Sequence, residues 1–178
     1  MWWAQEILSD ADRPRWTWVP FEGVGPLRFG QSVDEVAAAL DEPVHSFHSQ
    51  DRWVQFTTLG VDTYYSRDDR TLAAVAVDAC RGPQVLYGGT RLVGRLPSEL
   101  TPWIESTAES LEDMPPGLRG LRVGLNGEAC LPGLGLVMRC QHNGDYARTR
   151  PVLVAREWAE GSGDSWEGPI PKREWSCY

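Results

Sequence analysis

The sequence predicts an α+β protein built from two similar halves, each with a helix packed on an antiparallel β-meander, so that the two meanders can join into one continuous curved sheet. The first observation is a pattern that occurs twice, at residues 27–36 and 91–100, where a short apolar strand, a glycine and the start of a helix follow one another. The second is that strand-like segments with short connections follow each copy, as expected of antiparallel neighbours. We therefore expect an internal duplication.

The duplication also defines the expected organisation of the chain. Four pairs of positions align: Gly30 with Gly94, Glu35 with Glu99, Val36 with Leu100, and Leu40 with Ile104. The predicted parts are a Trp-rich N-terminal segment at 1–19, a first α+β repeat at 20–82, a second at 83–158, and a Gly-, Ser- and Pro-rich C-terminal tail at 159–178. The length of 178 residues suits one compact unit with a substantial core.

Composition and charge favour a folded protein that binds neither nucleic acid nor membrane. An apolar fraction of 42% and nine tryptophans are typical of an ordered chain. The formal net charge of −8 disfavours nucleic-acid binding, which needs a basic face. Because no basic leader or long apolar stretch is present, we expect a cytoplasmic protein. The arginine-rich, lysine-poor composition is typical of a GC-rich genome such as that of an actinobacterium.

Local signals place the first elements. Apolar residues at 2–8 can share one face of a short helix, and tryptophans alternate at 16–18 as in a strand. In the first repeat, Ser32 and Glu35 complete an S-x-x-E capping box, in which each side chain accepts a bond from the other residue's backbone N–H. This motif predicts a helix over 33–41.

Three strands are expected after that helix, at 53–58, 61–66 and 71–78. In the third strand both alternating sets of side chains are apolar, because Leu72, Ala74 and Ala76 interleave with Ala73, Val75 and Val77. A strand that is apolar on both faces is covered on both faces, so we expect this strand at the centre of the sheet.

The second repeat is predicted to contain strands at 84–89, 91–93, 121–123, 133–140 and 151–157. Pro97 fits the first turn of its helix, where a missing N–H costs nothing. Asn143-Gly144-Asp145 is a strong hairpin turn. The tail beyond residue 159 is expected to be loosely held, with Trp166 and Trp175 docking parts of it.

No motif carries a recognised catalytic grouping. The G-x-S-x-G, P-loop and dinucleotide-binding patterns are absent. The histidines have no metal-ligand spacing, and Cys80, Cys130, Cys140 and Cys177 contain no C-x-x-C pair. We expect free buried thiols, no metal and no cofactor, and these absences favour a protein that is not an enzyme.

Two polar arrangements remain open at this level. Asp62 and Asp78 lie on neighbouring predicted strands, so they can face each other as a general acid and base or simply face solvent. Arg148 and Arg150 precede the last strand, and they can bind an anion or pair with surface carboxylates.

Aromatic residues give the strongest indication of a binding surface. Seven of the nine tryptophans lie in or directly next to the two terminal segments, where they either complete the core or anchor an interface. The candidate binding residues are Trp16, Trp18, Trp53, Asp62, Tyr64, Tyr65 and Tyr87. Together they predict an acidic, aromatic surface on the sheet.

The segment VGPLRFGQSVDEV at 24–36 resembles the G-M-S/T-x-x-E/Q-V signature of the small outer-membrane assembly lipoproteins of the BamE/SmpA type and of the tandem-repeat β-lactamase inhibitor proteins. Gln31 stands in place of the usual methionine, and the second copy has RLPS at 95–98 instead of the signature. The resemblance implies helix-on-sheet repeats with a concave protein-binding sheet. The chain is also similar in general character to actinobacterial immunity-type proteins.

These observations predict a protein-binding module, and an immunity or inhibitor protein that occludes a basic toxin or enzyme is the most concrete version. The alternative is a small-molecule-binding protein or enzyme that uses a cavity between helix and sheet, lined by Trp53, Asp62, Tyr64 and Tyr65. A homodimer that buries the terminal tryptophans is a third possibility.

Overall fold

The computed structural model describes residues 6–176 and is an α+β fold with two sheets and four short helices. The larger sheet has the spatial order β4 (Trp53–Phe56), β5 (Val61–Tyr65), β6 (Leu72–Val77), β12 (Tyr146–Val154), β11 (Leu136–Asn143), β10 (Ala129–Leu131), β9 (Arg122–Val123). The smaller sheet has the order β3 (Leu27–Arg28), β2 (Gly23–Val24), β1 (Arg15–Val19), β7 (Gln84–Tyr87), β8 (Thr90–Arg91). The helices are α1 (Val33–Leu40), α2 (Pro97–Ser110), α3 (Arg156–Ala159) and α4 (Lys172–Ser176).

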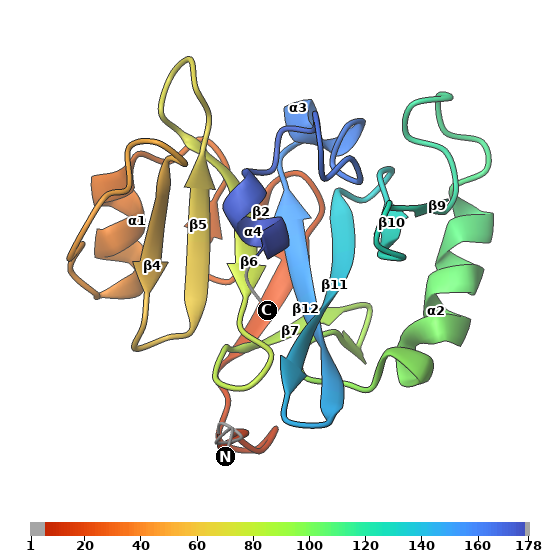
Figure 1. Cartoon of the computed structure of the whole chain (residues 1–178), viewed down its shortest axis with the longest axis horizontal. Coiled ribbons are helices and arrows are strands. Elements are labelled where there is room, and N and C mark those ends of the chain that lie inside the picture. The colour runs from red at the N-terminus through yellow and green to blue at the C-terminus, as the bar shows by residue number, and fades with distance from the viewer. Residues whose placement is uncertain (1–5, 177–178) are drawn as a thin grey trace.

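The larger sheet divides the molecule into two apolar layers. One face packs against the smaller sheet, α1 and α2, and this layer forms the main core. The other face is covered by the C-terminal segment, which contains α3 and α4 and crosses in front of β6 and β12 (Figure 1). Side chains alternate between the two layers because successive residues of a strand point to opposite faces.

The first helix confirms the predicted capping box. The Ser32 Oγ accepts a hydrogen bond from the Glu35 backbone N–H at 3.3 Å, and the Glu35 Oε2 accepts one from the Ser32 N–H at 2.8 Å. The helix ends at Leu40, one residue before the predicted end, because Asp41 adopts a left-handed conformation at φ +50°. Val36 and Leu40 are buried in the core, as the spacing predicts.

The predicted central strand is confirmed, because β6 lies between β5 and β12 and all six of its residues are buried. The predicted antiparallel pairing holds throughout the larger sheet. The smaller sheet differs, because β1 pairs with β7 in parallel. A parallel pair needs a long connection, and here the whole stretch between the two strands provides it. The N-terminal segment therefore contributes a central strand of the smaller sheet.

The two aligned glycines make the same backbone contacts with the two central strands of the larger sheet. The N–H of Gly30 donates to the carbonyl of Leu72, whose own N–H donates to Gln31, at 2.9 and 2.7 Å. The N–H of Gly94 donates to the carbonyl of Thr149, whose N–H donates to Arg95, both at 2.9 Å. Each strand-to-helix junction is thus tied to one strand, β6 or β12, in the same way.

Two expectations about the chain ends need correction. The helix predicted at 2–8 falls mostly outside the described residues, and residues 6–9 form no helix. The tail is not loosely held within the described residues, because Ser162, Ile170 and Glu174 are buried.

The last strand starts earlier than predicted, at Tyr146, since the hairpin continues up to the two-residue turn. Among the described residues, no helix is long and apolar enough to cross a membrane.

Substituting the two aligned glycines should give unequal losses of stability. Both have positive φ, +92° at Gly30 and +70° at Gly94, so alanine is strained at either position by about 1 kcal/mol. A Cβ at Gly94 would also lie 2.7 Å from the Ala79 carbonyl oxygen, whereas one at Gly30 meets nothing within 4 Å. We expect urea unfolding to show a larger loss for Gly94→Ala than for Gly30→Ala. Equal losses would mean that the contact at Ala79 relaxes freely.

Candidate functional site

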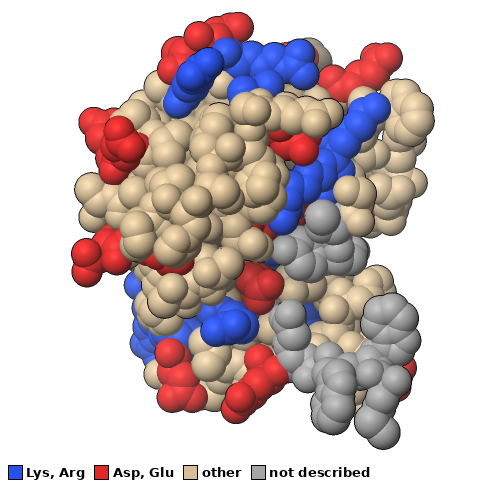
Figure 2. Space-filling view, turned by 60° about the vertical axis from the view of Figure 1, so that its left-hand side comes forward, with Lys and Arg blue, Asp and Glu red and all other residues tan. Residues whose placement is uncertain are grey.

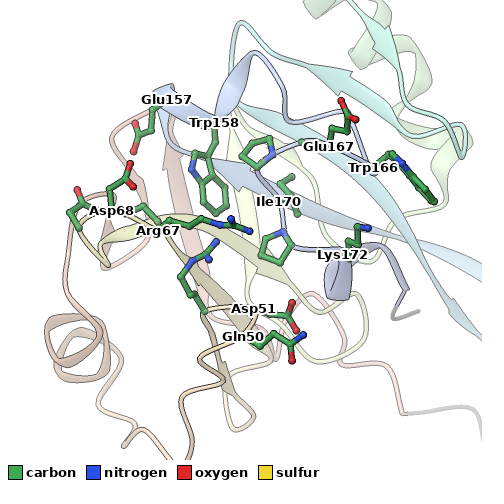
Figure 3. A pocket seen from close by; sticks show the side chains of 16 residues that line it. Gln50, Asp51, Arg67, Asp68, Glu157, Trp158, Trp166, Glu167, Ile170 and Lys172 are labelled. Carbon is green, nitrogen blue, oxygen red and sulfur yellow. Dashed lines mark hydrogen bonds between the residues drawn. The ribbon is translucent and has the colours of Figure 1, made fainter.

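An open cavity of about 840 Å³ lies beside the C-terminal segment (Figure 3). Four stretches line it: 50–52 before β4, 66–69 after β5, 157–158 in α3, and 166–172 leading into α4. Loops from the first half of the chain therefore form one wall, and the C-terminal segment forms the other. The cavity exists only where this segment is docked.

The C-terminal wall combines a buried apolar base with an exposed aromatic rim. Trp158 and Ile170 are 8% and 2% exposed and belong to the layer between the segment and the sheet. Trp166, in contrast, is 72% exposed. The Lys172 Nζ lies 4.9 Å from the centre of the Trp166 ring, within cation–π distance. Trp166 is thus a large aromatic surface held in the open, which is typical of an interface anchor.

Charged groups of both signs line the cavity. The five carboxylates are Asp51, Asp68, Asp69, Glu157 and Glu167, and the three cations are Arg52, Arg67 and Lys172. In Figure 3, Glu157, Asp68, Asp51 and Glu167 lie around the edge, whereas the side chain of Arg67 extends inward across the cavity. The rim is therefore predominantly acidic and the interior carries positive charge.

The C-terminal segment is held by an ionic cluster on the sheet beneath it. Arg139 on β11 and Arg150 on β12 are directly opposite each other across the strand pair, and both are nearly or fully buried. Like charges in directly opposite positions destabilise a sheet, and burial in an apolar layer raises that cost. The two arginines therefore require a carboxylate from elsewhere.

Glu174 of α4 supplies this carboxylate. Its Oε1 accepts hydrogen bonds at 2.8 Å from both Arg139 Nη1 and Arg150 Nε. Its Oε2 accepts bonds from the Tyr64 hydroxyl at 2.6 Å and from Arg150 Nη2 at 3.0 Å. Arg139 also donates to the backbone carbonyl of Glu174. One fully buried side chain thus bridges two arginines and connects α4 to three strands.

A second carboxylate completes the cluster. Asp62 Oδ2 accepts a hydrogen bond from Arg150 Nη2 at 2.7 Å and lies 3.7 Å from Arg173 Nη1. The guanidinium of Arg173 in turn lies 3.5 Å from the centre of the Trp53 ring. Small residues at Ala74 and Ala76 on this face of β6 leave room for α4 in front of them.

The two buried carboxyls have opposite pKa shifts. Burial alone would raise the pKa of Glu174, but the charges and hydrogen bonds of Arg150 and Arg139 lower it below its usual value. Burial raises the pKa of Asp62, and the attraction of Arg150 does not offset this because the negative charge of Glu174 also raises it. Glu174 is accordingly the ionised partner of the arginine pair.

Three of the seven sequence-predicted binding residues converge on this face. Trp53, Asp62 and Tyr64 all contact the C-terminal segment, so this segment covers the sheet surface where a partner was expected. The other four lie in the opposite layer: Trp16, Trp18, Tyr65 and Tyr87. The ring of Trp18 packs 5.0 Å from Tyr87, and Trp16 and Trp18 are buried. These four residues complete the main core.

Glu174 and Arg139 were not predicted as site residues, and Arg150 was expected either to bind an anion or to pair with surface carboxylates. A partial signal for the arginines exists, because Arg139 lies two residues from Val137 and Arg150 two residues from Val152, on the same face of their strands. No comparable signal exists for Glu174, which lies in a short polar stretch near the chain end.

The two aspartates considered for acid–base chemistry are held by hydrogen bonds within the fold. Asp62 binds Arg150, while Asp78 accepts bonds from the backbone of Cys80 and Arg81 and from Gln141 Nε2. Burial raises the pKa of the Cys130 thiol to about 11, so it is not a thiolate at neutral pH. No group of three metal-ligating side chains occurs between residues 6 and 176.

Comparison with known protein families, with curated proteins and with solved structures finds no match for this chain.

Replacing Glu174 should release the C-terminal segment. Glu174→Gln keeps the shape but removes the charge that neutralises Arg139 and Arg150, and loss of one partner of a buried ion pair costs about 3 kcal/mol. We expect amide hydrogen exchange at 170–176 to accelerate markedly. Glu167→Gln, in the same segment but exposed at the rim, is the matched control and should leave exchange unchanged. Unchanged protection in Glu174→Gln would contradict the role of this carboxylate.

Acid should weaken docking of the same segment. Because the folded pKa of Glu174 is lowered, its contribution to stability is fully present above the ordinary value of 4.5 and is lost as pH falls through the folded pKa. Asp62, with its raised pKa, takes up its proton first and changes stability in the opposite sense. We expect fluorescence of the half-buried Trp175 to report undocking below pH 4.5, and Glu174→Gln to lack this transition. A transition of equal size in both proteins would assign it to other groups.

Proposed function

We propose that the protein is a binding module that recognises another protein at the cavity beside its C-terminal segment. The observation that carries this proposal is the exposed Trp166, held by Lys172 on the rim of a cavity whose opposite wall carries charges of both signs. Exposed aromatic residues beside mixed charge are typical of interfaces. Asp62 and Asp78, the two carboxylates considered for acid–base chemistry, are instead engaged within the fold.

The partner we propose carries a basic surface, as an immunity or inhibitor protein would require. The chain has a formal charge of −8, and five carboxylates against three cations line the cavity. Such a rim would steer a basic partner toward the site. On the side of the molecule turned forward in Figure 2, acidic and basic side chains are interspersed around the edge, and uncharged residues cover much of the centre.

The architecture that we propose for this function is a duplicated one, with one helix and one antiparallel meander in each half. The matching hydrogen bonds of Gly30 and Gly94 support this interpretation, as does the contact of the two meanders at β6 and β12. The resemblance to the BamE/SmpA-type and tandem inhibitor proteins remains part of the proposal. In this chain the sheet face is covered by the C-terminal segment, so we propose that recognition occurs at the edge of that cover.

A small-molecule-binding role is the second candidate. The cavity volume of about 840 Å³ lies within the range of pockets for small ligands. Its site would be this surface cavity, because in the described structure Tyr64 and Tyr65 are fully buried and Trp53 is 8% exposed.

Site-specific crosslinking tests the proposed function. A photo-crosslinking amino acid at position 166 should give a discrete adduct with one protein in cells that express the chain, and excess unmodified chain should compete. The same group at position 146, where Tyr146 is 64% exposed on the β11–β12 hairpin, is the matched control and should give none. An adduct of twice the chain's mass would indicate self-association. Identical products from both positions, or none from position 166, would contradict recognition at the cavity.

A further inference from the structure

We propose that Arg52 and Arg67 form a clamp for a carboxylate side chain of the protein partner. This inference rests on the proposed function and names the chemistry at the centre of the same cavity. The partner would present an acidic residue to the two guanidinium groups and basic residues to the acidic rim around them.

The first support is geometric. Arg52 precedes β4 and its Nε donates to the Tyr65 carbonyl at 3.0 Å, which fixes the direction of the side chain. Its backbone is held in the left-handed region at φ +46°, a conformation that is uncommon for a residue with a Cβ and that is found disproportionately at functional sites. Arg67 follows β5, and its side chain extends into the cavity (Figure 3).

The second support is that neither arginine of this pair forms a salt bridge within the described residues. Among residues 6–176, no carboxylate lies within salt-bridge distance of either Arg52 or Arg67. The nearby Asp69 is occupied, since its Oδ1 accepts bonds from the Ser66 hydroxyl and from the backbone N–H and hydroxyl of Thr71.

The third support is the electrostatic relation between the two arginines. Partial burial lowers the pKa of Arg52, and the positive charge of Arg67 lowers it further, while Asp51 and Asp68 each raise it by less. Arg67 is thus the charge that acts most strongly on Arg52. A carboxylate placed between the two groups would relieve this repulsion, and the planar guanidinium suits bidentate binding of carboxylate.

The same chain already contains one filled site of this kind. Arg139 and Arg150 lie opposite each other on β11 and β12, and there Glu174 accepts hydrogen bonds from both. The pair at Arg52 and Arg67 differs in that it opens onto the cavity instead of lying under the C-terminal segment. A carboxylate from outside the chain can therefore reach it.

A matched pair of peptides tests the clamp by NMR titration of the full chain. The probes are acetyl-Lys-Glu-Lys-amide, whose lysines suit the acidic rim, and acetyl-Lys-Gln-Lys-amide, which differs only in the central carboxylate. We expect the Glu peptide to shift the amide signals of 66–69 and to bind about tenfold more tightly than the Gln peptide. Arg67→Gln should abolish this difference. Arg70→Gln, an exposed arginine in the same loop that does not line the cavity, should retain it.

Each other outcome overturns the clamp in a recognisable way. Equal binding of both peptides at the cavity would contradict a carboxylate site and leave recognition at the cavity intact. Inorganic phosphate that binds in an Arg67-dependent manner, without any preference for the Glu peptide, would assign the site to a free anion. If neither peptide shifts 66–69, the clamp is wrong, and crosslinking from position 166, which needs neither arginine, then decides the proposed function separately.

Discussion

The structure depends on the neutralisation of two buried arginines that face each other across β11 and β12. Arg139 and Arg150 lie in an apolar layer where neither water nor the strands themselves can compensate their charge. Glu174 bridges them with one carboxylate oxygen and reaches Tyr64 with the other. A buried charge without its partner is strongly destabilising, so this bridge fixes the position of α4 far more firmly than five helical residues could by themselves.

For the proposed function, the consequence is that the Glu174–arginine contact positions the C-terminal wall of the cavity. Once Glu174 is in place, Ile170 packs against the sheet and the loop before α4 becomes one wall of the cavity. Trp166 is then held outward instead of collapsing onto the apolar layer. The C-terminal wall of the cavity, with Trp166 and Lys172, is thus positioned by a buried cluster whose residues do not line the cavity.

The parts of the fold that follow from local rules could be predicted. The capping box of Ser32 and Glu35 starts α1, and the alternating apolar residues of β6 identify a strand covered on both faces. The site could not be predicted in the same way. Glu174 meets its partners across separations of 24, 35 and 110 residues, and no periodic pattern encodes such contacts. Aromatic richness identified Trp53 and Tyr64 on the correct face but did not show that the chain covers them itself.

A double-mutant cycle between Glu174 and Arg139 tests the central claim most directly. The free energy of unfolding would be measured for the native chain, Glu174→Gln, Arg139→Met and the double variant. If the carboxylate holds the segment by neutralising the arginine pair, the coupling energy should be about 2 kcal/mol, because Arg139→Met removes part of the charge that Glu174 balances. Additive effects, with a coupling energy near zero, would show that the segment docks by apolar packing and that the ionic bridge does not determine its position.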